Sequence, residues 1–408
     1  MQAVVAIPEQ PGRAGKRKPS ELLMMVVAGI PLLTRTPKTA VRAGVKDILV
    51  ICPPDLSEEA VRTFLERELH GDVQVQAVQL NKFDPHSIST WAKLAAHLEE
   101  RFLWLPWNWV TTSRLLAHLP PADIESINWS EPAYVTLQAL DVEGAAPVVP
   151  RPEGILVTSP QDIYLAERFL VAHSGKALDG IHTSFNRRLC RPFVRLLSHT
   201  AATPNQITCG GVLVSVLSAA AFAHGGYWYS ALGALFFYIA GLFDEMDGML
   251  ARITFTESPR GTWFEGIADG LSYLMLFGGI TIGLVHQYGR TAAVMGVLLL
   301  IGAGLALVAT SLQRRRATAP DRPQEYLGRI YHLLDKDSGN WISRIVRRLE
   351  TFVRRGIMIH YVVIFTLIGA LPLLFVLATL GAHLSWIVTL YMDHRFFPSR
   401  PQAGRVRT

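Results

Sequence analysis

Four acidic residues stand at helical spacing between two long apolar runs of the chain. In the stretch LFDEMDGMLARITFTESPRGTWFEGIADG, residues 242–270, Asp244 and Asp247 are three positions apart, and Glu265 and Asp269 are four apart. Residues at these intervals share a helix face, where neighbouring side chains lie about 5 to 6 Å apart. Two adjacent helices joined by a short loop would therefore direct four carboxylates at one another.

Carboxylates gathered in this way need a cation. Ionisable groups at the edge of a bilayer are costly, and like charges raise one another's pKa unless a positive ion holds them. Hard divalent ions such as Mg²⁺ and Mn²⁺ prefer carboxylate oxygens, and two such ions about 3.5 to 4 Å apart are the usual clamp for displacement at phosphorus. The pattern predicts a site for Mg²⁺ or Mn²⁺, with two ions, that acts on phosphate.

The spacing of the whole stretch is more specific than any single residue. It reads Asp244-x2-Asp247-Gly248-x2-Ala251-Arg252-x8-Gly261-x3-Glu265-x3-Asp269 and resembles the signature of the CDP-alcohol phosphotransferase family, D-x2-D-G-x2-A-R-x8-G-x3-D-x3-D. Seven of the eight fixed positions match, with every gap intact. The resemblance covers about residues 182–392, and TPNQIT at 203–208 is similar to that family's entry to its first membrane span.

The resemblance implies an activity and a role for each matching residue. A substituted phosphoryl group would pass from a CDP-alcohol to the hydroxyl of a second alcohol, which releases CMP and forms a phosphodiester, as in phospholipid or polyol phosphodiester synthesis. The metals would be ligated by Asp244, Asp247, Glu265 and Asp269, and Asp269 would also act as the base. The implied contacts with the CDP moiety are Gly248, Ala251, Arg252 and Gly261.

One position departs from the family, because its third aspartate is Glu265 here. The extra methylene moves the carboxylate by roughly an ångström, and an error of that size can cost about a hundredfold in rate. A non-catalytic membrane scaffold with a decayed site is therefore the alternative. A transporter is disfavoured, since transporters commonly carry repeated halves and this sequence shows none.

Composition divides the chain into two parts. Half of its 408 residues are hydrophobic and its mean hydropathy is +0.26, which favours an integral membrane protein. Residues 1–180 hold 17 Lys and Arg against 21 Asp and Glu, whereas residues 181–408 hold 22 against 12. We expect an α/β front domain at 21–176 and an all-α membrane domain at 203–394, flanked by a basic cytoplasmic tail at 395–408.

Six apolar runs of spanning length define the membrane domain. The positive-inside rule places the basic segments, both termini and the acidic site in the cytoplasm of a multi-pass protein of the inner membrane. The last two runs would count as one if they formed a single kinked helix. The six runs are residues 207–223, 228–250, 264–285, 292–312, 357–371 and 373–392.

A basic amphipathic segment at 182–202 precedes the first run. Phe185, Leu189, Phe193 and Leu197 share one helical face, which predicts a helix lying in the cytoplasmic interface of the bilayer. An ordinary surface helix of the front domain is the alternative. Arg354 and Arg355, before the fifth run, are candidates for the phosphate of the acceptor, although topology anchors are the more common role of such arginines.

The front domain resembles a nucleotidyltransferase. MVVAGIPLLTRTPKTAVRAGVKDILVI, residues 25–51, is similar to the opening of enzymes that make NDP-sugars and CDP-polyols, with a mostly parallel sheet. Its fusion to this membrane domain is similar to bifunctional enzymes that make CDP-inositol and then join it to inositol phosphate. The donor is therefore either CDP-diacylglycerol or a soluble CDP-polyol such as CDP-inositol, and the acceptor an alcohol or polyol phosphate.

Two features predict that the front domain is catalytically silent, with a docking or regulatory role. No Gly-rich loop with an arginine stands between the expected first strand and Pro31, and Asn108 occupies the position of a metal-binding aspartate. The upstream GRAGKRKP is assigned to a disordered basic tail at 1–20. A homodimer is compatible with the resemblance, and no nucleic acid is expected as a partner.

Overall fold

The computed structural model forms two compact units. It describes residues 1–7, 23–69, 71–85, 87–118, 132–136, 153–175, 181–320, 322–337, 339–353 and 355–397. The front unit comprises Met1–Ser174 together with two short pieces from later in the chain, Arg195–Thr200 and Ile253–Phe255. The helical unit comprises the remainder, Gly175–Val194, Ala201–Arg252 and Thr256–Thr408.

A five-stranded sheet forms the core of the front unit, in the order β5-β4-β1-β6-β8. All neighbours are parallel except β8, which runs antiparallel to β6. This confirms the predicted α/β unit with a mostly parallel sheet. The strands are β1 Gln2–Ala6, β4 Asp47–Cys52, β5 Gln74–Gln79, β6 Arg101–Pro106 and β8 Ala133–Thr136.

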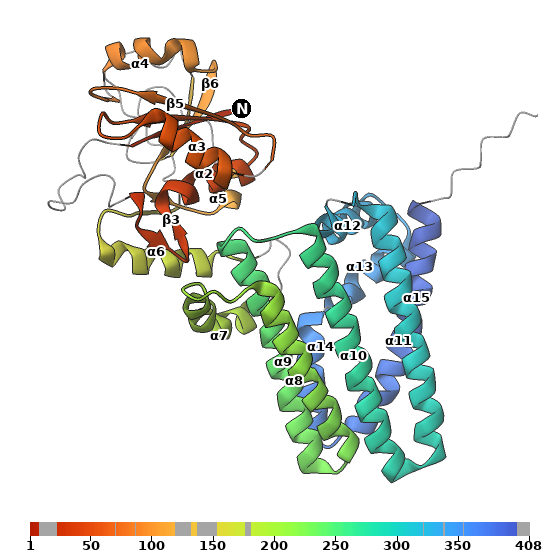
Figure 1. Ribbon diagram of the computed structural model, residues 1–408. Coiled ribbons are helices and arrows are strands. Elements are labelled where there is room, and N and C mark those ends of the chain that lie inside the picture. The colour runs from red at the N-terminus through yellow and green to blue at the C-terminus, as the bar shows by residue number, and fades with distance from the viewer. Residues whose placement is uncertain are drawn as a thin grey trace, which may run out of the picture. The chain divides into compact units, whose positions relative to one another are not determined.

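The central strands are almost continuous apolar runs, as parallel strands covered on both faces usually are. One face carries a core in which Val4, Leu49 and Phe102 pack with the rings of Trp91 and Trp104. Helices and two small two-stranded ribbons surround the sheet (Figure 1). They are α2 Leu32–Arg42, α3 Glu58–Glu68, α4 Ile88–Leu94, α5 Ser113–Ala117, α6 Pro160–Ala172, β2 Val26–Val27 with β3 Ile30–Pro31, and β7 Trp109–Val110 with β9 Ile155–Leu156.

The assignment of residues 1–20 to a disordered tail is wrong for Gln2–Ala6, because β1 is the central strand of the sheet. QAVVA is short, but it is entirely buried and β-branched at its centre, which suits a strand with neighbours on both sides. The strand expected near Val26 is only one arm of the β2–β3 hairpin.

The position of GRAGKRKP changes with this correction. The segment follows the first sheet strand instead of preceding it, so the argument that no basic Gly-containing loop follows the first strand does not hold. Residues 8–22, which include it, lie outside the described residues. The prediction of a silent front domain then depends on Asn108, whose side-chain amide donates to Val157 O at 2.8 Å.

The helical unit contains four helices long and apolar enough to cross a membrane, α8, α10, α11 and α15, and a shorter apolar helix, Ile357–Leu367. The predicted count of six spans also needs α9 and α14 and stays a prediction. The helices after the sheet domain are α7 Ile181–Leu197, α8 Pro204–His224, α9 Tyr227–Ile253, α10 Pro259–Tyr288, α11 Arg290–Ala317, α12 Tyr326–Lys336, α13 Trp341–Val353, α14 Arg355–Leu367 and α15 Leu371–Phe396.

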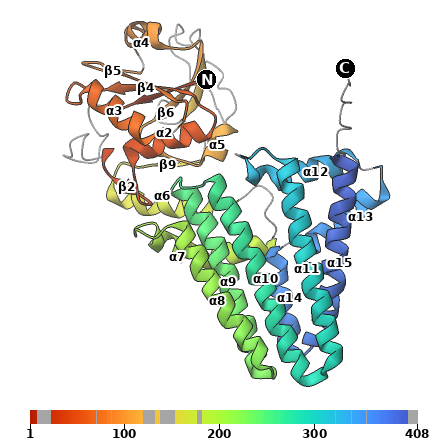
Figure 2. The same ribbon diagram turned by 45° about the vertical axis from the view of Figure 1, so that its right-hand side comes forward.

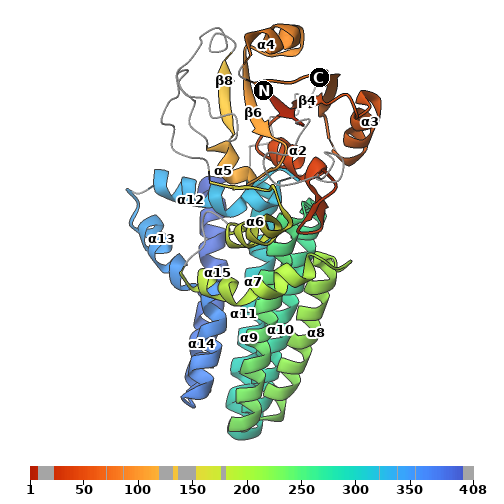
Figure 3. The ribbon, with the colours of Figure 1, turned by 90° about the vertical axis from the view of Figure 1, so that its left-hand side faces the viewer.

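The last two apolar runs form separate helices. Gly369 has a φ of +72°, a left-handed conformation suited to glycine, and Ala370 N donates to Phe365 O at 2.8 Å, which closes the end of α14. Pro372 then lies in the first turn of α15. Figure 3 shows α14 and α15 as distinct helices.

Local sequence signals fix the starts of α10, which carries Glu265 and Asp269, and of α8, which packs against it. Thr203 and Gln206 form a reciprocal capping box before α8, and Pro204 follows in the first turn, as the sequence predicts. Ser258 caps α10 by accepting from Gly261 N at 3.0 Å. These caps set the register of both helices at the end where the motif lies.

Small residues let α8 and α10 approach closely, and Figure 2 shows both helices in the same layer as α9. A Cβ at Gly279 would lie 2.3 Å from Ala219 O, and one at Gly283 would lie 2.1 Å from Phe222 O. Backbone contact of this kind is typical of small-x3-small pairs in membrane helices. It holds α10 against α8 along much of its length.

Two further parts of the helical unit, the connection after α11 and helix α7, can be compared with the predictions. The connection after α11 contains α12 and α13, where the sequence suggested only a basic loop, and α12 packs Tyr326, Ile330 and Tyr331 against Met392. In α7, Phe185, Leu189 and Phe193 are exposed, while Asn186, Cys190 and Val194, about 100° further round the helix, are buried. The exposed apolar face fits the predicted position at a bilayer interface.

Candidate metal and phosphate site

Three of the four motif carboxylates converge. Asp244, from the last turns of α9, and Glu265 and Asp269, from the first turns of α10, each offer an oxygen within 4.8 Å of the others. All three side chains are half-buried. Both helices present the acids because their spacing of three and four residues matches the helical repeat.

Asp247 is held differently from these three. Its side chain is 3% exposed, and its Oδ2 accepts a hydrogen bond from the hydroxyl of Thr208 on α8. The Thr208 hydroxyl oxygen also lies 3.1 Å from Pro204 O in the first turn of its own helix. Asp247 is thus oriented by a second helix, one turn along α9 from Asp244.

The donor set fits a hard divalent cation. Three carboxylates within bonding range of one point carry up to three negative charges in a partly desolvated place, and carboxylate oxygens are the ligands that Mg²⁺ and Mn²⁺ prefer. No histidine or cysteine belongs to this group, so a softer metal is disfavoured among the described residues. The geometry is compatible with a site for a hard divalent cation.

The four remaining motif residues lie around the junction between α9 and α10. A Cβ at Gly248 would lie 3.2 Å from Arg252 Nη1, so the Arg252 guanidinium covers the open side of Gly248 one turn away. Gly261 is in the first turn of α10, where a Cβ would lie 3.1 Å from Ser258 Oγ. Ala251 is half-buried in the last turn of α9.

Sequence reasoning missed an ion pair that joins α7 to the motif helix α9. Arg187 Nε of α7 donates to Glu245 Oε2 of α9 at 2.9 Å, and the two side chains are only 9% and 14% exposed. Glu245 stands between the two motif aspartates, and Arg187 is one of the arginines of the amphipathic helix. The combination of an extra acid inside the motif and a basic preceding helix was the available signal.

The two candidates for the acceptor phosphate stay a prediction. Arg354 and the side chain of Arg355 lie outside the described residues.

Comparison with known proteins adds a family to this geometry. Residues 201–391 match the family model described as CDP-alcohol phosphatidyltransferase. Among curated proteins, a bifunctional IPC transferase and DIPP synthase of Aquifex aeolicus is 24% identical over 238 residues, which cover 58% of this chain and 49% of the relative. The protein of the same name from Rubrobacter xylanophilus is 30% identical over 173 residues, 42% of this chain and 38% of the relative.

The chain therefore spans less than half the length of these two relatives. A solved structure, Mycobacterium tuberculosis phosphatidylinositol phosphate synthase with CDP-DAG bound, is 20% identical and covers 54% of this chain and 100% of its own, with a TM-score of 0.35.

Proposed function

We propose that the chain moves a substituted phosphoryl group from a CDP-alcohol to an acceptor alcohol, because residues 201–391 match the CDP-alcohol phosphatidyltransferase family model. The observation that carries the proposal is the convergence of Asp244, Glu265 and Asp269 within 4.8 Å at the matching motif positions. Glu265 shares in this convergence, which favours a working site over a decayed one.

The chemistry follows from the residues that face the site. A divalent ion held by the acidic cluster would neutralise the charge of the donor diphosphate. Asp269 takes the proton of the acceptor hydroxyl, whose oxygen forms a new bond to the phosphorus of the substituted phosphoryl group. The bond from that phosphorus to the oxygen of CMP breaks, so CMP leaves and a phosphodiester remains. Asp247, held by Thr208, supports the second of two proposed ions, Mg²⁺ or Mn²⁺.

The substrates are proposed at the level of chemical class. The curated relatives are named for IPC transfer and DIPP synthesis, which favours the CDP-inositol donor implied by the front domain, and CDP-diacylglycerol is the alternative. The acceptor would be an alcohol or a polyol phosphate, with Arg354 and Arg355 as the groups proposed to bind its phosphate.

The helical unit is an integral membrane domain. It contains four helices long and apolar enough to cross a membrane, and it matches the model of a membrane-protein family. We place the acidic site and both termini on the cytoplasmic side, where the basic segments of the chain would lie. The exposed apolar face of α7 is compatible with this placement because the helix precedes α8 at the same end.

The test is CMP release by the full chain purified in detergent, with Mg²⁺ or Mn²⁺. CDP-inositol and CDP-diacylglycerol are supplied separately with a panel of acceptor alcohols and polyol phosphates. Metal-dependent CMP formation that Asp269→Asn removes supports the transferase and identifies the donor. Absence of CMP with every donor, in a preparation that binds Mn²⁺, favours the scaffold.

A further inference from the structure

We propose that the front unit positions the transferase motif, with Arg35 and Glu167 as the positioning residues that hold the segment between its two acidic halves. This inference deepens the proposed function and rests on it. The eight residues between Arg252 and Gly261 connect Asp244 and Asp247 to Glu265 and Asp269, and their first three, Ile253–Phe255, are part of the front unit.

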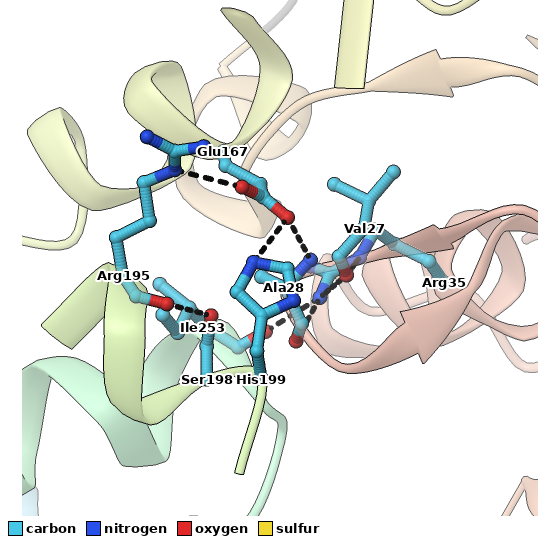
Figure 4. A network of polar contacts seen from close by, with 8 residues as sticks. All are labelled: Val27, Ala28, Arg35, Glu167, Arg195, Ser198, His199 and Ile253. Carbon is cyan, nitrogen blue, oxygen red and sulfur yellow. Dashed lines mark hydrogen bonds and ion pairs between the residues drawn. The ribbon is translucent and has the colours of Figure 1, made fainter. Parts of the chain in front are cut away.

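Arg35 of α2 is the first anchor of this segment. Its side chain is 1% exposed, and its guanidinium donates to Val27 O from Nε at 3.0 Å and from Nη2 at 2.8 Å. The same Nη2 donates to Ile253 O at 2.9 Å (Figure 4). A buried guanidinium needs acceptors for its charge, and Ile253 supplies one of them from 218 residues away in sequence.

Phe255 is the second anchor. The guanidinium carbons of Arg35 and Arg42 lie 5.3 Å and 4.9 Å from the centre of its ring, so two cations of α2 cover one aromatic side chain. Its φ is +57°, a conformation that bulky residues adopt only where their surroundings enforce it. The other non-glycine residue with positive φ in the described chain is Ala28, next to Val27 in the same network.

Glu167 of α6 joins the second inserted piece, Arg195–Thr200, to this anchor. Its carboxylate is 1% exposed and accepts from Ala28 N at 3.1 Å and from Arg195 Nε at 2.9 Å, and it pairs with His199 Nε2 at 3.0 Å. A Cβ at Gly29 would lie 2.5 Å from Ser198 O, so the hairpin backbone itself contacts this piece. Two N–H donors and a histidine partner on one buried carboxylate make a contact that is specific in direction.

The two anchors leave little freedom in the connection between the acidic helices. α9 ends at Ile253, Phe255 is held under two arginines, and Thr256 N donates to Ala251 O at 3.0 Å. Ser258 then caps α10. Four residues of the connection, Ile253, Phe255, Thr256 and Ser258, are thus held by specific contacts, and Ile253 and Phe255 are held by residues of the front unit.

The first test is hydrogen exchange of the full chain in detergent, followed on peptides that cover residues 251–258. In Arg35→Met, these amides are expected to exchange at least about tenfold faster than in the wild type, since local opening exposes them. Lys38→Met is the matched control, because it removes a cation of the same helix whose partner is the outer Glu68 at 2.9 Å. Fast exchange of this peptide in the wild type would overturn the proposal.

The second test measures what the anchoring does for the site. Arg35→Met is expected to raise the Mn²⁺ concentration for half-maximal binding, followed by electron paramagnetic resonance, about tenfold and to lower kcat for CMP release about ten- to a hundredfold, as displaced catalytic groups do. KM for the CDP-alcohol is expected to change less than about threefold, since the donor's own contacts remain. Unchanged Mn²⁺ binding and kcat would show that the anchor has no positioning role.

Variants of Phe255 keep the test valid if Arg35→Met does not fold. Phe255→Gly removes the ring and relieves the positive φ while the sheet core stays intact, and it is expected to reproduce the loss. Phe255→Tyr retains the ring and is expected to retain wild-type values. If the wild type releases no CMP, the proposed function is refuted but the anchoring is not. Hydrogen exchange and Mn²⁺ binding still decide whether Arg35 and Phe255 position the segment.

Discussion

The acidic cluster and the network around Arg35 and Glu167 both bring ionisable side chains together, but they do so in opposite ways. In the network, Glu167 accepts from two N–H donors and pairs with His199, and Arg35 donates to backbone carbonyls on two segments. In the cluster, Asp244, Glu265 and Asp269 approach one another within 4.8 Å. Charge that the fold neutralises itself indicates a structural role, whereas like charges brought together indicate a bound cation.

The largest expected effect lies in the cluster. Asp269→Asn keeps the size of the side chain and removes the proposed base, so CMP release should fall about a thousandfold, within the range for loss of acid–base catalysis. The measurement is the initial rate at saturating Mg²⁺ and donor. Glu257→Gln serves as control, because Glu257 is an exposed acid of the connecting segment, and it should retain the wild-type rate.

Substitution of Glu167 in the network should lower the stability of the front unit. Glu167→Gln leaves Arg195 and His199 facing a neutral group, and because these two side chains are 35% and 46% exposed, the loss of the charge-assisted contacts costs about 2 kcal/mol. Thermal unfolding followed by tryptophan fluorescence should show a lower midpoint for the front unit. Glu68→Gln breaks the more exposed pair with Lys38 and should cost less than about 1 kcal/mol. Equal effects of the two substitutions would argue against a special role for Glu167.

Glu265→Asp tests whether the cluster is adapted to its longer acid. The Glu265 oxygen already lies with those of Asp244 and Asp269, so shortening the side chain should withdraw it and lower the rate of CMP release about ten- to a hundredfold. A faster Glu265→Asp variant would instead mean that the glutamate is a defect.

Thr208→Val sharpens the distinction within the motif itself. Valine keeps the shape of the side chain but removes the hydroxyl that orients the buried Asp247. Loss of this hydrogen bond costs about 1.4 kcal/mol, which corresponds to about tenfold weaker binding of the metal. The Mg²⁺ concentration for half-maximal CMP release should therefore rise about tenfold. Ser215→Ala, which removes a hydroxyl bonded to Gly211 O within α8, should leave it unchanged.

Local signals made much of this structure predictable. The capping box of Thr203 and Gln206, the start of α6 at Ser159 and Pro160, and the apolar runs of β4 and β6 all concern residues near one another in sequence. The shared helix face of Glu265 and Asp269 follows in the same way from their spacing.

The parts that were missed depend on contacts between distant residues. β1 needs its neighbours β4 and β6 to be recognised as a central strand, and the five residues QAVVA alone do not supply that information. The hydrogen bonds from Thr208 to Asp247 and from Arg35 to Ile253 join different elements and leave no periodic pattern in the sequence. Glu245, in contrast, could be recognised in the sequence as an extra acid within the motif. Its partner, Arg187, could not be identified from the sequence.

The central place of β1 also has a consequence for synthesis of the protein. Gln2 lies opposite Asp47 on one side and Phe102 on the other, so the nascent chain must keep one edge of QAVVA unpaired until β4 emerges and the other until β6 emerges. An apolar strand with free edges is prone to pair with other chains. Until Pro106 has left the ribosome, β1 therefore keeps an unpaired apolar edge, and binding by a chaperone would protect it from aggregation.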